Sequence, residues 1–110
     1  MIVNSEKRVE ALLTSGVKRM GGVAYKFVSP GNSGVPDRII LMPGGRIYFV
    51  ELKREGGQLT NLQKRQVSRI RKLDCRVDVL HGVVEVSNFL LRLQADQLEG
   101  GHFTKRGDAL

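Results

Sequence analysis

The chain has 110 residues, 41% of them hydrophobic, and its 18 Lys and Arg against 11 Asp and Glu give a net charge of +7. This predicts one small globular domain with a nucleic-acid or other polyanionic partner. The only cysteine, Cys75, excludes an intramolecular disulfide and a cysteine zinc cluster, and the sequence contains no signal peptide and no apolar run that could span a membrane.

Residues 5–20 predict the first helix, which Gly21-Gly22 would end. Two glutamates one turn apart lie at its apolar stripe: Glu6 projects inside the stripe and Glu10 just past its edge. A carboxylate in such a place needs a partner, for example a metal ion. The alternative for Glu6 is a first-turn glutamate favoured by the helix dipole. The stripe consists of Val9, Leu12, Leu13, Val17 and Met20.

A strand is predicted over residues 23–28, and the composition of residues 29–34 predicts a loop. The loop leads into Asp37 and is expected to flank any site there. Lys26 and Ser29 are therefore candidates for contacts with a phosphate group. The alternative for each is an ordinary surface role, as a solvated strand lysine and a turn serine.

Residues 34–53 are the most informative stretch, because they predict a hairpin of two strands. The run 39–42 is apolar, and the run 47–50 is rich in β-branched and aromatic residues. Between them, Pro43-Gly44-Gly45 is a strong turn signal. A hairpin places the start of its first strand beside the end of its second.

Three ionisable residues occupy those two places in the hairpin. Asp37 precedes the first strand, and Glu51 and Lys53 end the second on one face, because strand side chains alternate. We expect the two carboxylates and the amine to converge at one sheet edge. Carboxylates bind a hard cation such as Mg²⁺, which polarises a phosphoryl oxygen and makes bound water a better nucleophile. The alternative is a surface ion pair of Glu51 with Lys53, with Asp37 as a turn residue.

Residues 60–73 predict a second long helix whose polar arc is basic. Gln63 is the exception, because it projects among apolar residues toward the sheet, and Thr60-x-x-Gln63 fits a capping box. The basic arc either follows a DNA backbone or is simply a solvated face. Its candidate DNA contacts are Lys64, Arg65, Arg69 and Lys72.

The strand predicted over residues 76–80 follows a helix, so it should lie parallel to the second hairpin strand. His81, directly after it, has no metal-ligand spacing and is expected to be an ordinary surface residue.

Residues 83–95 predict the last helix. Its apolar residues Phe89, Leu90 and Leu93 either close the core or supply part of a subunit interface. Periodicity is lost over residues 96–110, which predicts a flexible tail.

These motifs resemble a known family over roughly residues 5–90. Gly34-Val35-Pro36-Asp37 followed by Glu51-Leu52-Lys53 is similar to the PD-(D/E)xK nuclease superfamily. The further motifs resemble its VRR-NUC branch (virus-type replication-repair nuclease) in the stand-alone, phage-type form. They are Lys26-Phe27, Ser29-Pro30-Gly31, Pro43-Gly44-Gly45, the strand end before Lys53, and Gln63.

The resemblance implies a cofactor and a set of roles. Mg²⁺ or Mn²⁺ would be held by Asp37, Glu51, the Leu52 carbonyl and one glutamate of the first helix, with Glu6 and Glu10 as open alternatives. Lys53 and Gln63 would position the attacking water and the phosphate.

The predicted fold is α/β: a small mixed β-sheet of about four strands flanked by helices, in the order α-β-β-β-α-β-α. Its restriction-endonuclease-like core would span residues 1–95. The predicted function is that of a metal-dependent DNA endonuclease, by analogy selective for branched DNA such as Holliday junctions. It would act as a homodimer in the cytoplasm of a bacterial or phage-infected cell. Alternatives are a catalytically silent DNA-binding module, a flap- or single-strand-directed nuclease, and an interaction protein with an acidic partner.

Overall fold

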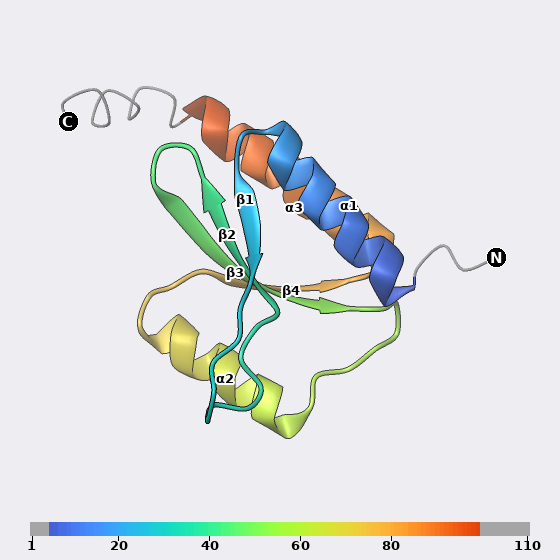
Figure 1. Cartoon of the computed structure of the whole chain (residues 1–110), viewed down its shortest axis with the longest axis vertical. Helices are drawn as coiled ribbons and strands as arrows, with labels where there is room; N and C mark the ends of the chain where they lie inside the picture. The colour runs from blue at the N-terminus through green and yellow to red at the C-terminus, as the bar shows by residue number, and fades with distance from the viewer. Residues whose placement is uncertain (1–4, 100–110) are drawn as a thin grey trace.

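The computed structural model describes residues 5–99 and has helices and strands in the predicted order (Figure 1). Each predicted element is present, with ends that differ by a few residues. The elements are α1 (Glu6–Arg19), β1 (Val23–Lys26), β2 (Arg38–Met42), β3 (Arg46–Lys53), α2 (Asn61–Lys72), β4 (Val77–His81) and α3 (Gly82–Glu99).

The four strands form one mixed sheet in the order β1-β2-β3-β4. The β1–β2 and β2–β3 pairs are antiparallel, and β4 lies parallel to β3, as the crossover through α2 predicts. The predicted α/β fold is therefore confirmed. No helix among the described residues combines the length and apolarity needed to cross a membrane.

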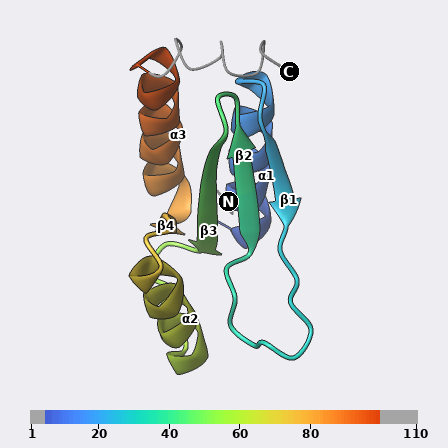
Figure 2. The ribbon, with the colours of Figure 1, turned by 90° about the vertical axis from the view of Figure 1, so that its left-hand side faces the viewer.

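One face of the sheet carries the core, because α1 and α3 lie side by side across it (Figures 1 and 2). Alternation along β2 and β3 directs Ile40 and Val50 into this layer, where both are fully buried. The helices contribute Val9, Leu13, Val17, Val86, Phe89 and Leu93, none of them more than 1% exposed. Of the two alternatives for the last helix, Phe89 and Leu93 therefore take the first and close the monomer's core, and Leu90 packs against it while only partly buried.

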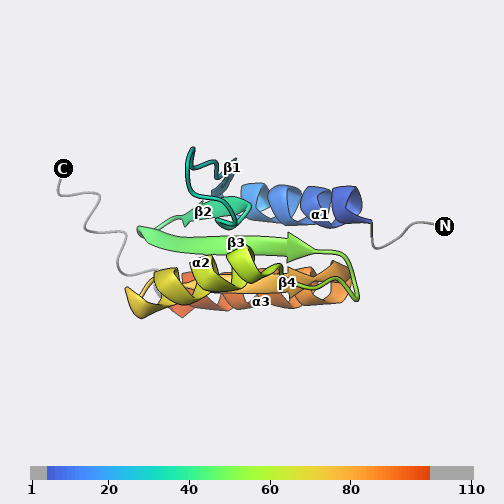
Figure 3. The ribbon, with the colours of Figure 1, turned by 90° about the horizontal axis from the view of Figure 1, so that it is seen from below.

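The opposite face of the sheet is only partly covered. Helix α2 lies on this side, beside β3 and β4, and buries a single residue, Val67 (Figures 1 and 3). Leu62 in its first turn and Leu73 at its C-terminal end remain 49% and 72% exposed. Figure 2 looks onto the part of β1–β3 that no helix covers. One side of the sheet is thus closed by two helices, and the other is largely open.

The last helix is longer than its periodicity predicts. It continues to Glu99, so residues 96–99 belong to α3, and the tail boundary placed after residue 95 is wrong by four residues. Asp96 is held in place because its Oδ2 accepts from Tyr48 Oη at 3.2 Å and its carbonyl accepts from Arg46 Nη1 at 2.8 Å. The remainder of the predicted tail, residues 100–110, lies outside the described residues.

Candidate active site

The hairpin brings Asp37 to the end of β3, as predicted. The Asp37 carbonyl accepts from Phe27 N at 2.9 Å, which extends the β1–β2 ladder by one residue. Asp37 Oδ2 accepts from Leu52 N, also at 2.9 Å. In an antiparallel ladder a residue's N–H and C=O point to the same neighbour, so the Leu52 carbonyl faces the Asp37 side as well. The carboxylate and the carbonyl therefore lie on the same side of β3, at the end of the β2–β3 pair.

Glu51 lies beside Asp37 and is 2% exposed, an unusual burial for a carboxylate. Its Oε2 accepts from Gln63 Nε2 at 3.2 Å and lies 4.0 Å from Lys53 Nζ, whereas its Oε1 is buried without a partner. Burial, followed by the neighbouring Asp37 carboxylate, raises the pKa of Glu51 to about 8. Lys53 opposes this shift. The site thus has an excess of negative charge with too few cations to balance it.

Gln63 is oriented by the start of its own helix. The capping box is complete: Gln63 N donates to Thr60 Oγ1 at 3.1 Å, and Gln63 Oε1 accepts from Thr60 N at 2.9 Å. Because the amide oxygen is engaged there, the amide nitrogen is directed toward Glu51. Capping and a place in the site therefore coexist, as the sequence allowed.

Gly34 fixes the loop before Asp37 against the first turn of α2. Its φ is +87°, and a Cβ at this position would lie 2.7 Å from the Leu62 carbonyl carbon and oxygen. The neighbouring Ser33 carbonyl accepts from Gln66 Nε2 at 3.3 Å. Only glycine allows this approach, which holds the loop beside α2.

Gly34→Ala is expected to destabilise the protein more than Gly31→Ala does. Both positions have positive φ, but a Cβ on Gly31 would meet nothing within 4 Å. The extra cost of the clash is about 1–3 kcal/mol. Thermal or denaturant unfolding of both variants measures the difference, and equal losses would show that Gly34 is required only for its backbone conformation.

The two glutamates of α1 have different surroundings. Glu10 Oε2 pairs with Arg38 Nη2 at 3.3 Å, and Arg38 lies on the core face of β2, away from Asp37. Glu6 is exposed, rather than inside the apolar stripe, and after burial and Asp37 its charge makes a smaller contribution to the raised pKa of Glu51. Glu10 is therefore engaged on the core face, whereas Glu6 has no such ion pair among the described residues.

Arg38 is a buried residue that the sequence interpretation missed. It is 8% exposed and donates to the Ala24 carbonyl at 2.9 Å in addition to its pair with Glu10. The signal was present, because alternation places Arg38 on the same face as Ile40 and Met42. Arg38 ties β2 to both β1 and α1 immediately after Asp37.

The predicted DNA contacts fall into two groups. Lys26 is exposed and pairs with Arg38 across β1 and β2, which places it on the sheet face opposite Glu51. Ser29 accepts from Asn32 Nδ2 at 2.9 Å within its own turn. The four basic residues of α2 all lie exposed on the same side of the sheet as the carboxylates: Lys64, Arg65, Arg69 and Lys72.

Comparison with known proteins decides the family. The family model for the VRR-NUC domain matches residues 5–84. The chain belongs to the VRR-NUC family. Within 75 aligned residues it is 48% identical to "Putative nuclease p44" of Acyrthosiphon pisum secondary endosymbiont phage 1, covering 68% of this chain and 81% of that protein.

Solved structures agree with this assignment. A VRR-NUC domain of known structure aligns with a TM-score of 0.74 and 31% identity, covering 77% of this chain and 92% of the other. A second VRR-NUC domain protein aligns with a TM-score of 0.59 over 79% of this chain and 85% of the other. At 22% identity, that second match supports the fold alone.

The carboxylates at the end of β3 and the oxygens around them are ligand types that a hard cation takes, although acidic residues are few. No three His, Cys, Asp or Glu side chains within residues 5–99 converge as a metal-binding group. The possible metal ligands that lie together are oxygens: the carboxylates of Asp37 and Glu51 and the backbone carbonyl of Leu52. Mg²⁺ keeps several waters and needs only one or two carboxylates. The unpartnered Glu51 Oε1 is the atom that such a cation would satisfy.

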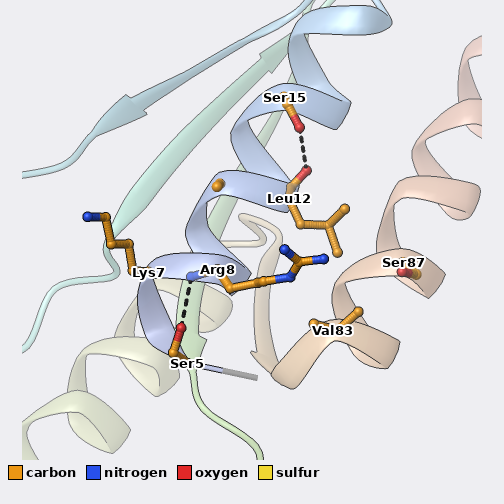
Figure 4. Close-up of a pocket in the computed structure, with 8 residues that line it drawn as sticks. Ser5, Lys7, Arg8, Leu12, Ser15, Val83 and Ser87 are labelled. Atoms are coloured by element: carbon orange, nitrogen blue, oxygen red, sulfur yellow. Dashed lines mark hydrogen bonds between the residues drawn. The ribbon is translucent and has the colours of Figure 1, made fainter. Parts of the chain in front are cut away.

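A separate pocket of about 530 Å³ lies between α1 and α3 (Figure 4). Arg8 extends into it toward α3, whereas Lys7 points away. Ser5 Oγ accepts from Arg8 N at 3.3 Å, and Ser15 Oγ donates to the Leu12 carbonyl at 3.4 Å. These hydroxyls serve the helix backbone, so the pocket has no clear polar set for a ligand.

Proposed function

We propose that this VRR-NUC domain is a DNA endonuclease that hydrolyses phosphodiester bonds with Mg²⁺ or Mn²⁺. The observation that carries the proposal is the buried, unpartnered Glu51 Oε1 beside the Asp37 carboxylate. Leaving such a group unsatisfied is costly, which is characteristic of a site built for a cation rather than for stability. The net charge of +7 supports a polyanionic substrate.

The proposed roles follow from position. Asp37, Glu51 and the Leu52 carbonyl would hold the ion, with Glu6 acting only through a bound water. When bound, the ion supplies Lewis-acid polarisation of the phosphate and a more acidic water. Lys53, whose Nζ lies 4.0 Å from Glu51, would stabilise charge on the phosphate. Gln63 would orient the Glu51 carboxylate, to which it donates a hydrogen bond, and would position the attacking water.

Lys53 and the basic face of α2 should affect different steps. Lys53→Ala is expected to slow single-turnover cleavage of bound DNA roughly a hundredfold, with little change in affinity, because it acts at the reacting phosphate. Replacing Arg65, Arg69 and Lys72 should instead weaken binding. The slope of the logarithm of the binding constant against the logarithm of the salt concentration should become shallower by about one for each residue lost. Titrations at several salt concentrations and rates at saturating protein separate the two effects. Loss of affinity alone in Lys53→Ala would rule out its catalytic role.

We further propose a two-fold homodimer on branched DNA such as a Holliday junction, where each subunit would cut one of two symmetry-related strands. The support is the open sheet face, on which Val23, Tyr25 and Ile47 are 41%, 60% and 54% exposed. Ile39, Leu41 and Phe49 continue the same face by alternation, and none of these six residues is charged. Two basic chains repel each other, so an uncharged apolar face is the surface best suited to join them.

Ile47→Glu is expected to convert the dimer to a monomer. Leu91→Glu, at a position 63% exposed on α3, is the matched control and should leave the dimer intact. Light scattering at micromolar protein measures both masses, and unfolding curves verify that each variant folds. A wild-type monomer, or an Ile47→Glu dimer, would rule out this interface.

Cleavage of a substrate panel tests the proposed function. Linear duplex, flap, splayed-arm and four-way junction DNA are incubated with the protein and Mg²⁺, and with EDTA. We expect metal-dependent cleavage, fastest on the junction. Preference for flaps or single strands would support the alternative nuclease class. Tight binding without cleavage of any substrate would support a catalytically silent DNA-binding module.

A further inference from the structure

His81 is the residue beside Lys53 in the sheet. The parallel ladder of β3 and β4 pairs Lys53 with His81, and paired residues of neighbouring strands project to the same face about 4.8 Å apart. The same ladder pairs Leu52 with Leu80, and both of those residues face the core. His81 is therefore on the face that carries Glu51 and Lys53, and its side chain is 33% exposed.

Glu85, in the first turn of α3, fixes the orientation of the imidazole. Its Oε1 accepts from His81 N at 2.8 Å and lies 3.1 Å from His81 Nδ1. The backbone hydrogen bond from His81 lowers the pKa of Glu85, so this carboxylate is ionised and can only accept. Nδ1 must then be the donor of the pair. Nε2 makes no hydrogen bond to any residue in the part of the chain that the structure describes.

We propose that His81 binds a DNA phosphate through Nε2, next to the phosphate at Lys53, with Glu85 as its positioning residue. With Nδ1–H directed to Glu85, a ring that is protonated on both nitrogens presents an Nε2–H donor for a charge-assisted hydrogen bond to a phosphate oxygen, and a phosphate anion beside the ring favours that form. The inference rests on the proposed function, because it takes Lys53 as the residue at the reacting phosphate. It extends the substrate-contacting surface from β3 onto β4 and the start of α3.

A pair of conservative variants separates substrate contact from a structural role. The amide of His81→Asn reaches only the Nδ1 position, so it retains the contact with Glu85 and loses the donor at Nε2. The amide of His81→Gln reaches the Nε2 position instead. With Ca²⁺ in place of Mg²⁺, we expect His81→Asn to bind DNA about tenfold more weakly than wild type, and His81→Gln to retain most of the affinity. Both should unfold at nearly the wild-type temperature.

Ring NMR gives a readout that does not depend on cleavage. The chain has two histidines, so a His102→Gln background leaves the His81 ring signals alone. Saturating duplex DNA should shift the His81 Nε2 resonance together with the amides of residues 51–53. A shift of those amides with an unmoved ring, or wild-type affinity in His81→Asn, would overturn the role of His81 while leaving the proposed function in place. If DNA moves neither the ring nor the amides, the proposed function fails with it.

Discussion

Asp37→Ala is expected to reduce metal-dependent cleavage by at least about a thousandfold, equivalent to ~4 kcal/mol of transition-state stabilisation. Asp37 contributes one of only two carboxylates to the proposed ion site, and it also fixes Leu52 through a 2.9 Å hydrogen bond to its amide. DNA affinity should stay the same or increase, because a negative charge is removed next to the phosphate. Single-turnover rates and binding titrations measure the two effects.

Asp78→Ala provides the matched control. Asp78 is also a carboxylate of the sheet, but it pairs with Arg92 at 3.3 Å on the core face. Its loss should affect stability and leave the cleavage rate of folded protein near wild type. Substantial cleavage by Asp37→Ala, or an equal loss of activity in both variants, would show that the proposed site is wrong.

Glu51→Gln is expected to abolish cleavage and to stabilise the metal-free protein at alkaline pH. Folding raises the pKa of Glu51 from 4.5 to about 8, so the folded state favours the protonated carboxyl. The contribution of this group to stability is fully present below about pH 4.5 and is lost as the pH rises through about 8. The loss is on the order of several kcal/mol, because each unit of pKa shift corresponds to about 1.4 kcal/mol.

Unfolding measured from acid to alkaline pH in EDTA tests this expectation. The difference in stability between Glu51→Gln and wild type should be small in acid and should grow as the pH approaches 8. Added Mg²⁺ should then stabilise wild type and not the variant, since a ligand that binds only the folded state shifts its stability. If the stabilities of the two proteins change in parallel with pH, the pKa of Glu51 is not raised by folding.

The sequence was most informative where local rules agree. Alternation and turn chemistry placed Asp37, Glu51 and Lys53 at one sheet edge, and the capping pattern at Thr60 located Gln63 at a helix start. These features depend on residues close together in the chain, so short-range geometry is enough to predict them.

Other features depend on tertiary contacts and were not predictable in the same way. The sequence did not indicate how little of the sheet α2 covers, or that Leu62 and Leu73 stay exposed. The sequence left Glu6 and Glu10 as alternatives, and the ion pair of Glu10 with Arg38 depends on how α1 packs on β2. The place of His81 beside Lys53 follows from the register of β4, which no local pattern specifies.

The most direct test of the metal site is anomalous diffraction from crystals of the protein soaked with Mn²⁺. We expect one strong peak within coordination distance of the Asp37 and Glu51 carboxylates and the Leu52 carbonyl, and none in crystals of Asp37→Ala. Clear density for these residues with no ion between them, in a protein that still cuts DNA with Mn²⁺, would contradict the proposed site.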